Sequence, residues 1–221
     1  MRTSLSEPQL LKYLEKQISN LFPDEMEICL SETVPSALKK IEYCFAHILL
    51  KHYRLGGQIY FNHLNADHYV VFIYFCSNIA YKTGDINLAS KLFYLNKTLH
   101  GFHCMYDTEL PDIFLVIHGG GIVLGKAKYS NYFFVAQGCT VGANGHCEYP
   151  ILGEGVVMYP NSSIVGKSRI GQNSCLSNGA FVNNCDIEKD TLVIDRSPNL
   201  ILKPNRADRL STFFKISPSV I

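Results

Sequence analysis

The chain has 221 residues, of which 47% are hydrophobic and 18% are charged. This composition excludes a disordered chain, and the length is enough for one large domain or two small ones. The 20 Lys and Arg residues balance the 19 Asp and Glu residues, so the charge gives no reason to expect nucleic acid or an anionic membrane surface as a partner.

The N-terminus, the apolar runs and the cysteines bear on where the protein works. The first seven residues lack the apolar stretch of a signal peptide. The longest apolar run, 69–80, is interrupted by Ser77 and Asn78 and is too short for a membrane span, so we expect a buried helix there. The eight cysteines form no Cys-x-x-Cys pair and no Cys/His cluster with zinc-site spacing. We therefore expect free thiols, no metal and a cytoplasmic location.

Helical spacing characterises the first hundred residues. Leu10, Leu14 and Ile18 form an apolar stripe of the kind that one face of a helix presents to a core. Capping residues and turn residues then mark the boundaries. Two helices are predicted to begin near Ser6 and near Thr33. Two more are predicted over 66–81 and 86–100, with a turn between them at 82–85. We predict an α-helical subdomain over residues 1–105.

A six-residue repeat of apolar residues replaces the helical spacing after residue 110. One series consists of Leu152, Met158, Ile164, Ile170, Leu176 and Val182. A second series, counted back from Val141, consists of Val141, Val135, Tyr129, Val123 and Ile117. The two series are separated by one position less than two repeats, which predicts a loop over 143–150 that leaves the regular path. A further slip by one residue gives Ile187 and Val193.

A six-residue period is typical of a solenoid whose triangular coils consist of three short parallel strands. Every sixth side chain then points into a narrow stacked core, and glycines such as Gly125 and Gly166 suit the tight corners. An ordinary β-sandwich would produce this spacing only by accident. We predict a mainly β fold, with a parallel β-helix over residues 106–200 and a C-terminal tail over 201–221.

The repeat and its motifs resemble the hexapeptide-repeat acyltransferases, and among them the serine acetyltransferases. The most similar stretches are Ile-His-Gly-Gly-Gly-Ile-Val-Leu-Gly at 117–125, Gln-Gly-Cys-Thr-Val-Gly at 137–142 and Gly-Glu-Gly-Val-Val at 153–157. The resemblance implies a left-handed parallel β-helix, which is an exception to the usual right-handed crossover. It also implies a homotrimer that uses acetyl-CoA as the acetyl donor.

In that family, a histidine at the position of His118 is the general base that takes the proton of the acceptor hydroxyl. An imidazole with a near-neutral pKa suits this exchange, and the glycines at 119–121 leave space beside it. The resemblance also implies residues that face the pantetheine arm: Gly142, Ala143, Pro160 and Asn178. Candidate partners of the phosphates are Lys167 and Arg169, or Arg196 and Lys203.

The acceptor-binding positions depart from the serine acetyltransferase pattern. The Asp that supports the base aligns with Gly-Phe-His-Cys at 101–104, where His103 is the group available to orient His118. The acidic residue directly before the base is Ile117, and the Arg-His pair of the extruded loop aligns with Glu148 and Tyr149. The carboxylate of serine would meet no cation there, so we expect a different acceptor.

The loop over 143–150 suits a neutral, polyhydroxylated acceptor. Tyr149 supplies a stacking surface, and Asn144, His146 and Glu148 supply hydrogen bonds. Tyr106 and Asp107 offer the same chemistry near the junction with the helices. We therefore expect an acetyl-CoA-dependent O-acetyltransferase that acts on a sugar hydroxyl, similar to the family members associated with bacterial surface polysaccharide synthesis.

Other readings stay open. One is a serine O-acetyltransferase of cysteine biosynthesis, with which the terminal Ile221 agrees. Another is a non-catalytic trimeric scaffold that lost the supporting Asp. Within the enzymatic readings, a backbone N–H such as that of Gly142 could bind the oxyanion, and Cys139 or Cys147 could form a covalent acyl-enzyme.

Overall fold

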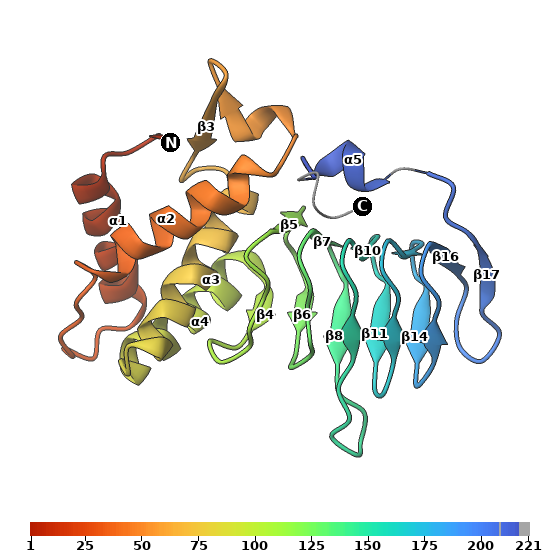
Figure 1. The fold of residues 1–221 in the computed structure, drawn as a ribbon. Coiled ribbons are helices and arrows are strands. Elements are labelled where there is room, and N and C mark those ends of the chain that lie inside the picture. Colours follow the sequence, from red (N-terminus) through yellow and green to blue (C-terminus); the bar gives the residue numbers. More distant parts are fainter. Residues whose placement is uncertain (208, 217–221) are drawn as a thin grey trace.

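A computed structural model describes residues 1–207 and 209–216, which form a helical part and a long β-solenoid (Figure 1). Within these ranges no helix is long and apolar enough to cross a lipid bilayer. Residues 217–221, which include the terminal isoleucine considered above, lie outside the described residues.

Four helices build the N-terminal part, and local sequence explains where they begin. α1 begins after Ser6, whose side chain accepts a hydrogen bond from the N–H of Gln9 while the Gln9 side chain accepts one from the N–H of Ser6. The helices are α1 (Glu7–Leu21), α2 (Thr33–Ala46), α3 (Ala66–Lys82) and α4 (Ile86–His100). A small sheet of β1 (Arg2–Thr3), β2 (Arg54–Leu55) and β3 (Gln58–Phe61) joins them after a 3-10 turn, Lys51–Tyr53. The four predicted helices are confirmed.

The apolar run at 69–80 is the central helix, α3, which packs against α2 and α4. Its two buried polar side chains within this run, Ser77 and Asn78, are hydrogen-bonded. The Ser77 hydroxyl donates to the carbonyl of Ala89 at 3.0 Å, and the Asn78 amide donates to the carbonyl of Tyr106 at 2.9 Å. Because these groups have partners, the helix can be buried on nearly all sides without a large polar cost.

Three parallel sheets form the sides of the solenoid, and we name them faces 1, 2 and 3. Face 1 consists of β5 (Phe114–Ile117), β7 (Phe133–Ala136), β10 (Val157–Met158), β13 (Cys175–Leu176) and β16 (Thr191–Ile194), with β17 (Ile201–Pro204) added antiparallel. Face 2 consists of β4 (Phe102–Cys104), β6 (Ile122–Leu124), β8 (Thr140–Gly142), β11 (Ser163–Val165) and β14 (Phe181–Asn183). Face 3 consists of β9 (Ile151–Leu152), β12 (Arg169–Ile170) and β15 (Asp186–Ile187).

A column of buried side chains lies behind each face. Face 1 contributes Val116, Val135, Met158, Leu176 and Val193. Face 2 contributes Cys104, Leu124, Val141, Ile164 and Val182. Face 3 contributes Leu152, Ile170 and Ile187. These columns confirm the six-residue repeat from Val135 onward.

The predicted repeat is wrong at its N-terminal end. Val123 is 38% exposed, whereas Leu124 is fully buried and pairs with Val141. Likewise Val116 is fully buried, and Ile117 is only partly so. The physical reason is that five residues rather than six lead from Leu124 to Tyr129, whose neighbour Lys128 pairs with Ile151 of face 3, and this moves the inward position from Val123 to Leu124. The corner between β5 and β6 then contains two more residues than the regular repeat, so Val116 is the inward residue of β5.

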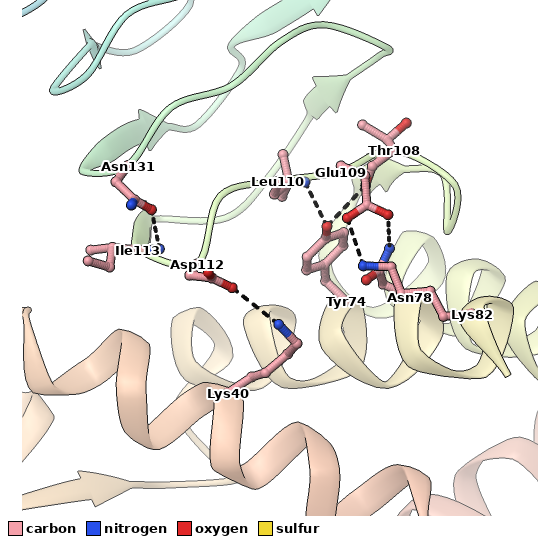
Figure 2. A network of polar contacts seen from close by, with 10 residues as sticks. All are labelled: Lys40, Tyr74, Asn78, Lys82, Thr108, Glu109, Leu110, Asp112, Ile113 and Asn131. Atoms are coloured by element: carbon pink, nitrogen blue, oxygen red, sulfur yellow. Dashed lines mark hydrogen bonds and ion pairs between the residues drawn. The ribbon is translucent and has the colours of Figure 1, made fainter.

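Hydrogen bonds dock the helical part onto the first coil (Figure 2). The Tyr74 hydroxyl on α3 donates to the carbonyl of Thr108 at 3.0 Å and accepts from the N–H of Leu110 at 2.8 Å. Two exposed ion pairs flank this contact: Lys82–Glu109 and Lys40–Asp112. Because β4 already pairs with β6, the first coil begins at Phe102. The predicted boundary at residue 105 therefore falls inside that coil.

The segment after residue 200 folds back over the outer surface of face 1. α5 (Arg209–Phe213) lies above β7 and β10 (Figure 1), and the Phe213 ring stacks on Phe134 with 4.6 Å between centroids. Phe214 is 1% exposed, and the N–H of Leu49 donates to the carbonyl of Phe213 at 2.8 Å. This C-terminal strap, residues 209–214, therefore buries the apolar outer side chains of face 1 and ties them to the end of α2.

Two glycines provide a direct test of the coil packing. A methyl group on Gly171 would lie 2.6 Å from the carbonyl carbon of Glu188 in the next coil, whereas one on Gly145 would meet nothing within 4 Å. We expect Gly171→Ala to lower the free energy of unfolding by about 3 kcal/mol, because backbone must move to accept the methyl group. The control Gly145→Ala should change it by less than about 0.5 kcal/mol. Chemical denaturation checks both, and equal stabilities would contradict the packing described here.

Candidate active site

His118 lies at the corner where the chain passes from face 1 to face 2. Its side chain is exposed, and its backbone has φ +55°. Left-handed backbone is uncommon for a residue with a side chain and needs support from its surroundings. Gly121, with φ +65°, completes the turn into β6. The corner therefore presents an imidazole to solvent on a bent backbone with little bulk beside it.

The support comes from Asp67, in the first turn of α3. One carboxylate oxygen of Asp67 accepts from the N–H of His118 at 3.1 Å, and the other accepts from the N–H of Gly119 at 3.0 Å. Hydrogen bonds to a carboxylate are stronger than those between neutral groups. No residue pattern pointed to Asp67, because it is 51 positions away from His118 in the sequence.

We expect Asp67→Ala to loosen the corner without unfolding the protein. The loss of two charge-assisted hydrogen bonds should make the amides of His118 and Gly119 exchange faster with solvent by at least about 10-fold. Asp85→Ala is the control, because the Asp85 carboxylate also accepts from a backbone N–H, that of Leu88 in the first turn of α4, and not from the His118 corner. Hydrogen exchange read at single amides measures the effect. Unchanged exchange at both amides would show that Asp67 does not hold the corner.

His103, the residue considered as a substitute for the missing Asp, lies in β4 opposite Val123 on the outer surface of face 2. Its ring makes an edge contact with Phe93 on α4, with 5.2 Å between centroids. Burial lowers the pKa of His103, with a smaller contribution from Lys97. Among the described residues, the side chain that contacts the His118 corner through hydrogen bonds is Asp67 rather than His103.

Two of the predicted cofactor residues lie on the same edge of the solenoid as His118. We call this edge corner 1–2; it consists of the stacked segments 118–121, 137–139, 159–162 and 177–180. Backbone hydrogen bonds join the successive segments, from Gly138 to the carbonyl of Gly120 and from Gly179 to the carbonyl of Pro160. Pro160 and Asn178 therefore follow His118 along one straight edge.

The remaining predicted residues lie on the opposite edge of face 2, which we call corner 2–3. The loop over 143–150 leaves the solenoid there, below β8 (Figure 1), as predicted. Gly142 is the last residue of β8, and a methyl group on it would meet nothing within 4 Å. Ala143 begins the loop. Within one chain, the structure thus separates His118 from Gly142, Ala143 and the loop by the width of face 2.

Asn144 organises the loop. Its amide group donates to the Glu148 carboxylate at 2.7 Å and to Asn184 at 3.1 Å, while its oxygen accepts from the N–H groups of His146 and Glu148. The side chain of Asn144 is therefore engaged within the loop. His146 is exposed, and Tyr149 is 46% exposed, so these two side chains are accessible to a ligand.

An aromatic cluster beside the loop was only partly visible in the sequence. The rings of Tyr81 and Tyr106 lie 5.2 Å apart, and Phe93 contacts both Tyr106 and His103. An ion pair of 3.0 Å between Lys126 and Asp107 lies at the same end of face 2. Tyr106 and Asp107 were named from the sequence as candidates for acceptor binding. Tyr81 and Phe93 were not named, because they lie in helices whose apolar residues were assigned to the core.

The structure gives no support for Cys139 or Cys147 as the nucleophile of a covalent acyl-enzyme. Cys139 is fully buried, and its thiol lies 3.1 Å from the carbonyl oxygen of Tyr159. Burial raises the pKa of Cys139, which disfavours the thiolate that a nucleophile needs. Cys147 is exposed in the loop, across face 2 from His118. Within the described part of the chain, no three His, Cys, Asp or Glu side chains are placed to bind a metal ion.

Comparisons with protein-family models and with curated protein sequences give no significant match. Solved structures do match. A serine acetyltransferase from Brucella abortus is 14% identical, with 89% of this chain and 75% of that chain covered and a TM-score of 0.60. The Neisseria gonorrhoeae serine acetyltransferase is 22% identical, with coverages of 89% and 74% and a TM-score of 0.60. The soybean serine acetyltransferase is 16% identical, with coverages of 87% and 75% and a TM-score of 0.63.

These structures match the helical part and the solenoid together, since they cover most of the chain. The predicted fold class is thereby confirmed. The chain has the fold of the serine acetyltransferases, in which an N-terminal helical part precedes a left-handed parallel β-helix.

Proposed function

We propose that this protein transfers an acetyl group from acetyl-CoA to a hydroxyl group, with His118 as the general base. The observation that carries the proposal is the exposed imidazole on a glycine corner that the Asp67 carboxylate clasps through two backbone N–H groups. Left-handed backbone at a residue other than glycine needs support from its surroundings, and here that support holds the exposed imidazole in a defined position. The likeness in fold to serine acetyltransferases, one of which was solved in complex with CoA, agrees with the proposal.

In the proposed reaction, every proton transferred and every bond formed or broken is accounted for. The imidazole of His118 takes the proton of the acceptor hydroxyl, whose oxygen attacks the thioester carbonyl carbon and forms the new C–O bond. The C–S bond then breaks, and the imidazolium returns the proton to the leaving thiolate of CoA. A backbone N–H at a corner, with Gly142 of a neighbouring copy as our candidate, would stabilise the oxyanion between these steps.

We propose a sugar hydroxyl of a bacterial surface glycan, or of its precursor, as the acceptor. The loop over 143–150 contains no Lys or Arg, so it provides no permanent cation for an amino acid carboxylate. Instead the loop offers the exposed side chains of His146 and Tyr149, with Glu148 half-buried next to Asn144. Neutral hydroxyls suit such donors, acceptors and rings.

The second candidate is serine O-acetylation. It is favoured by the fold likeness, since the soybean and Neisseria gonorrhoeae enzymes were solved in complex with serine. The position of Glu148 argues against it, because a carboxylate there would repel the carboxylate of serine.

We further propose a homotrimer in the cytoplasm. His118 precedes β6 and the loop follows β8, so they lie at opposite edges of face 2 in one chain. Packing of three copies side by side would let the loop of one copy reach corner 1–2 of the next. The strap lies over β7 and β10 of face 1 and not over faces 2 and 3, which are our candidates for such contacts. Analytical ultracentrifugation measures the number of copies, and a monomer at the concentration used for activity assays would contradict this assembly.

The test of the function is release of the free thiol of CoA from acetyl-CoA, measured with L-serine and with a panel of sugars and glycan fragments. We expect release with a sugar acceptor and none with serine. Release with serine alone would replace the sugar proposal by the second candidate. A protein that neither releases CoA with any acceptor nor binds CoA would be a scaffold, and the proposed function would be wrong.

A further inference from the structure

A hollow of about 370 Å³ lies on the solenoid where the C-terminal strap meets corner 1–2. Its lining residues are Tyr159, Ser177, Asn178, Leu192, Ile194 and Arg209. Neither Asp nor Glu is among them, so the charge of the lining is that of the Arg209 guanidinium. The hollow therefore suits an anionic group.

Arg209 is held in place from one side and open on the other. One terminal nitrogen of its guanidinium donates to the Tyr159 hydroxyl at 3.0 Å, and the group lies over the Tyr159 ring at 5.3 Å from the centroid. Its Nε is buried and has no hydrogen-bond partner among the described residues. The Arg209 side chain also forms no ion pair with any of these residues. A guanidinium in this state has donors left for a phosphate, which it can bind through two parallel hydrogen bonds.

The hollow lies at a definite distance from His118 along the same edge. Asn178 is in the fourth segment of corner 1–2 and His118 is in the first, so three steps between coils separate them. With about 4.8 Å per step, the separation along the edge is about 14 Å. An extended pantetheine arm, which links a thiol to a diphosphate, is of comparable length. A thioester at His118 would therefore place its diphosphate at the hollow.

We propose that Arg209 binds the diphosphate of the CoA thioester and that the C-terminal strap exists in part to carry it there. This inference rests on the proposed function and names a residue for it. The strap is anchored independently of Arg209, since Leu210 packs against Gly155 and the Phe213 ring stacks on Phe134. The binding residue can thus be removed without releasing the strap.

The experiment is isothermal titration of the full chain with CoA and with pantetheine, which lacks the diphosphate. We expect Arg209→Ala to weaken CoA binding about 10- to 100-fold, as loss of a charge-assisted contact does, and to leave pantetheine binding unchanged. Arg209→Lys should keep part of the CoA affinity, since the charge remains but the fork is lost. Lys189→Ala is the control, because this exposed cation follows β15 on a different corner and should not affect CoA.

Other results would overturn the inference in different ways. Unchanged CoA affinity in Arg209→Ala would remove Arg209 from the site. Equal losses for CoA and pantetheine would show a disturbed groove and no contact with phosphate. Binding of UDP that depends on Arg209, together with CoA binding that does not, would assign the hollow to a nucleotide-linked acceptor. Absence of CoA binding by the unmodified protein would instead defeat the proposed function itself.

Discussion

Replacement of His118 by asparagine is expected to lower kcat/KM for acetyl transfer by about 10²- to 10⁴-fold, the usual contribution of a general base. Asparagine is the suitable replacement because His118 has φ +55°, a conformation that asparagine tolerates better than most residues. The variant therefore removes the imidazole while keeping the backbone that Asp67 holds. Alanine at this position would combine loss of the base with strain in the corner.

The measurement is the rate of CoA release with the acceptor that the panel identifies. The control is CoA binding by the same variant, which should change by less than about 2-fold, since His118 acts on the proton of the acceptor. The melting temperature should also stay the same, because the His118 side chain is exposed. Full activity in a folded His118→Asn protein that binds CoA would show that another group is the base.

Acidification from pH 7.5 to 4.5 is expected to lower the free energy of unfolding by roughly 3 kcal/mol through His68 alone. Burial lowers the pKa of His68 to about 3 from an ordinary value of 6.5, and nearby His52 adds to the shift. His68 is 0% exposed and its ring lies 4.2 Å from that of Tyr53. The N–H of Asn62 donates to Nδ1, so the proton of the neutral ring is on Nε2, for which the described residues supply no acceptor.

The direction of this pH dependence follows from the number of protons that His68 binds in the folded and in the unfolded chain. Between pH 6.5 and about 3 the unfolded chain binds a proton at His68 and the folded chain does not, so stability falls as the pH falls. Above pH 6.5 neither state binds the proton, and the stability from this group is constant. His100 acts in the same direction, because burial lowers its pKa to about 4 even though Asp67 and Asn96 oppose the shift.

Urea denaturation at a series of pH values measures this dependence. We expect His68→Asn to be less stable at pH 7.5 but to lose less stability on acidification, because its side-chain oxygen still accepts from Asn62 while nothing titrates. His146→Asn, which removes an exposed histidine, should keep the dependence of the unmodified protein. If His68→Asn is too unstable to study, an NMR titration of His68 in the unmodified protein decides the matter. A midpoint near pH 6.5 would contradict the expected burial effect.

Local patterns in the sequence determined much of the fold. The inward positions from Val135 to Val182, the loop over 143–150 and the four helices follow from spacing and capping alone. A strand or a helix selects its side-chain period through backbone stereochemistry, which is a local property. The six-residue period adds only that each coil stacks on the previous one, and this too repeats along the chain.

Only the tertiary structure decided the surroundings of His118. Asp67 reaches the corner because α3 docks on the first coil, and Arg209 reaches corner 1–2 because the strap folds back over face 1. Val123 lies outside rather than inside because the step from β6 to face 3 is one residue shorter than the regular repeat. Such contacts join segments that are far apart in the sequence, and their free energy depends on how whole elements pack. The residue pattern within one segment therefore does not predict which distant segment it contacts.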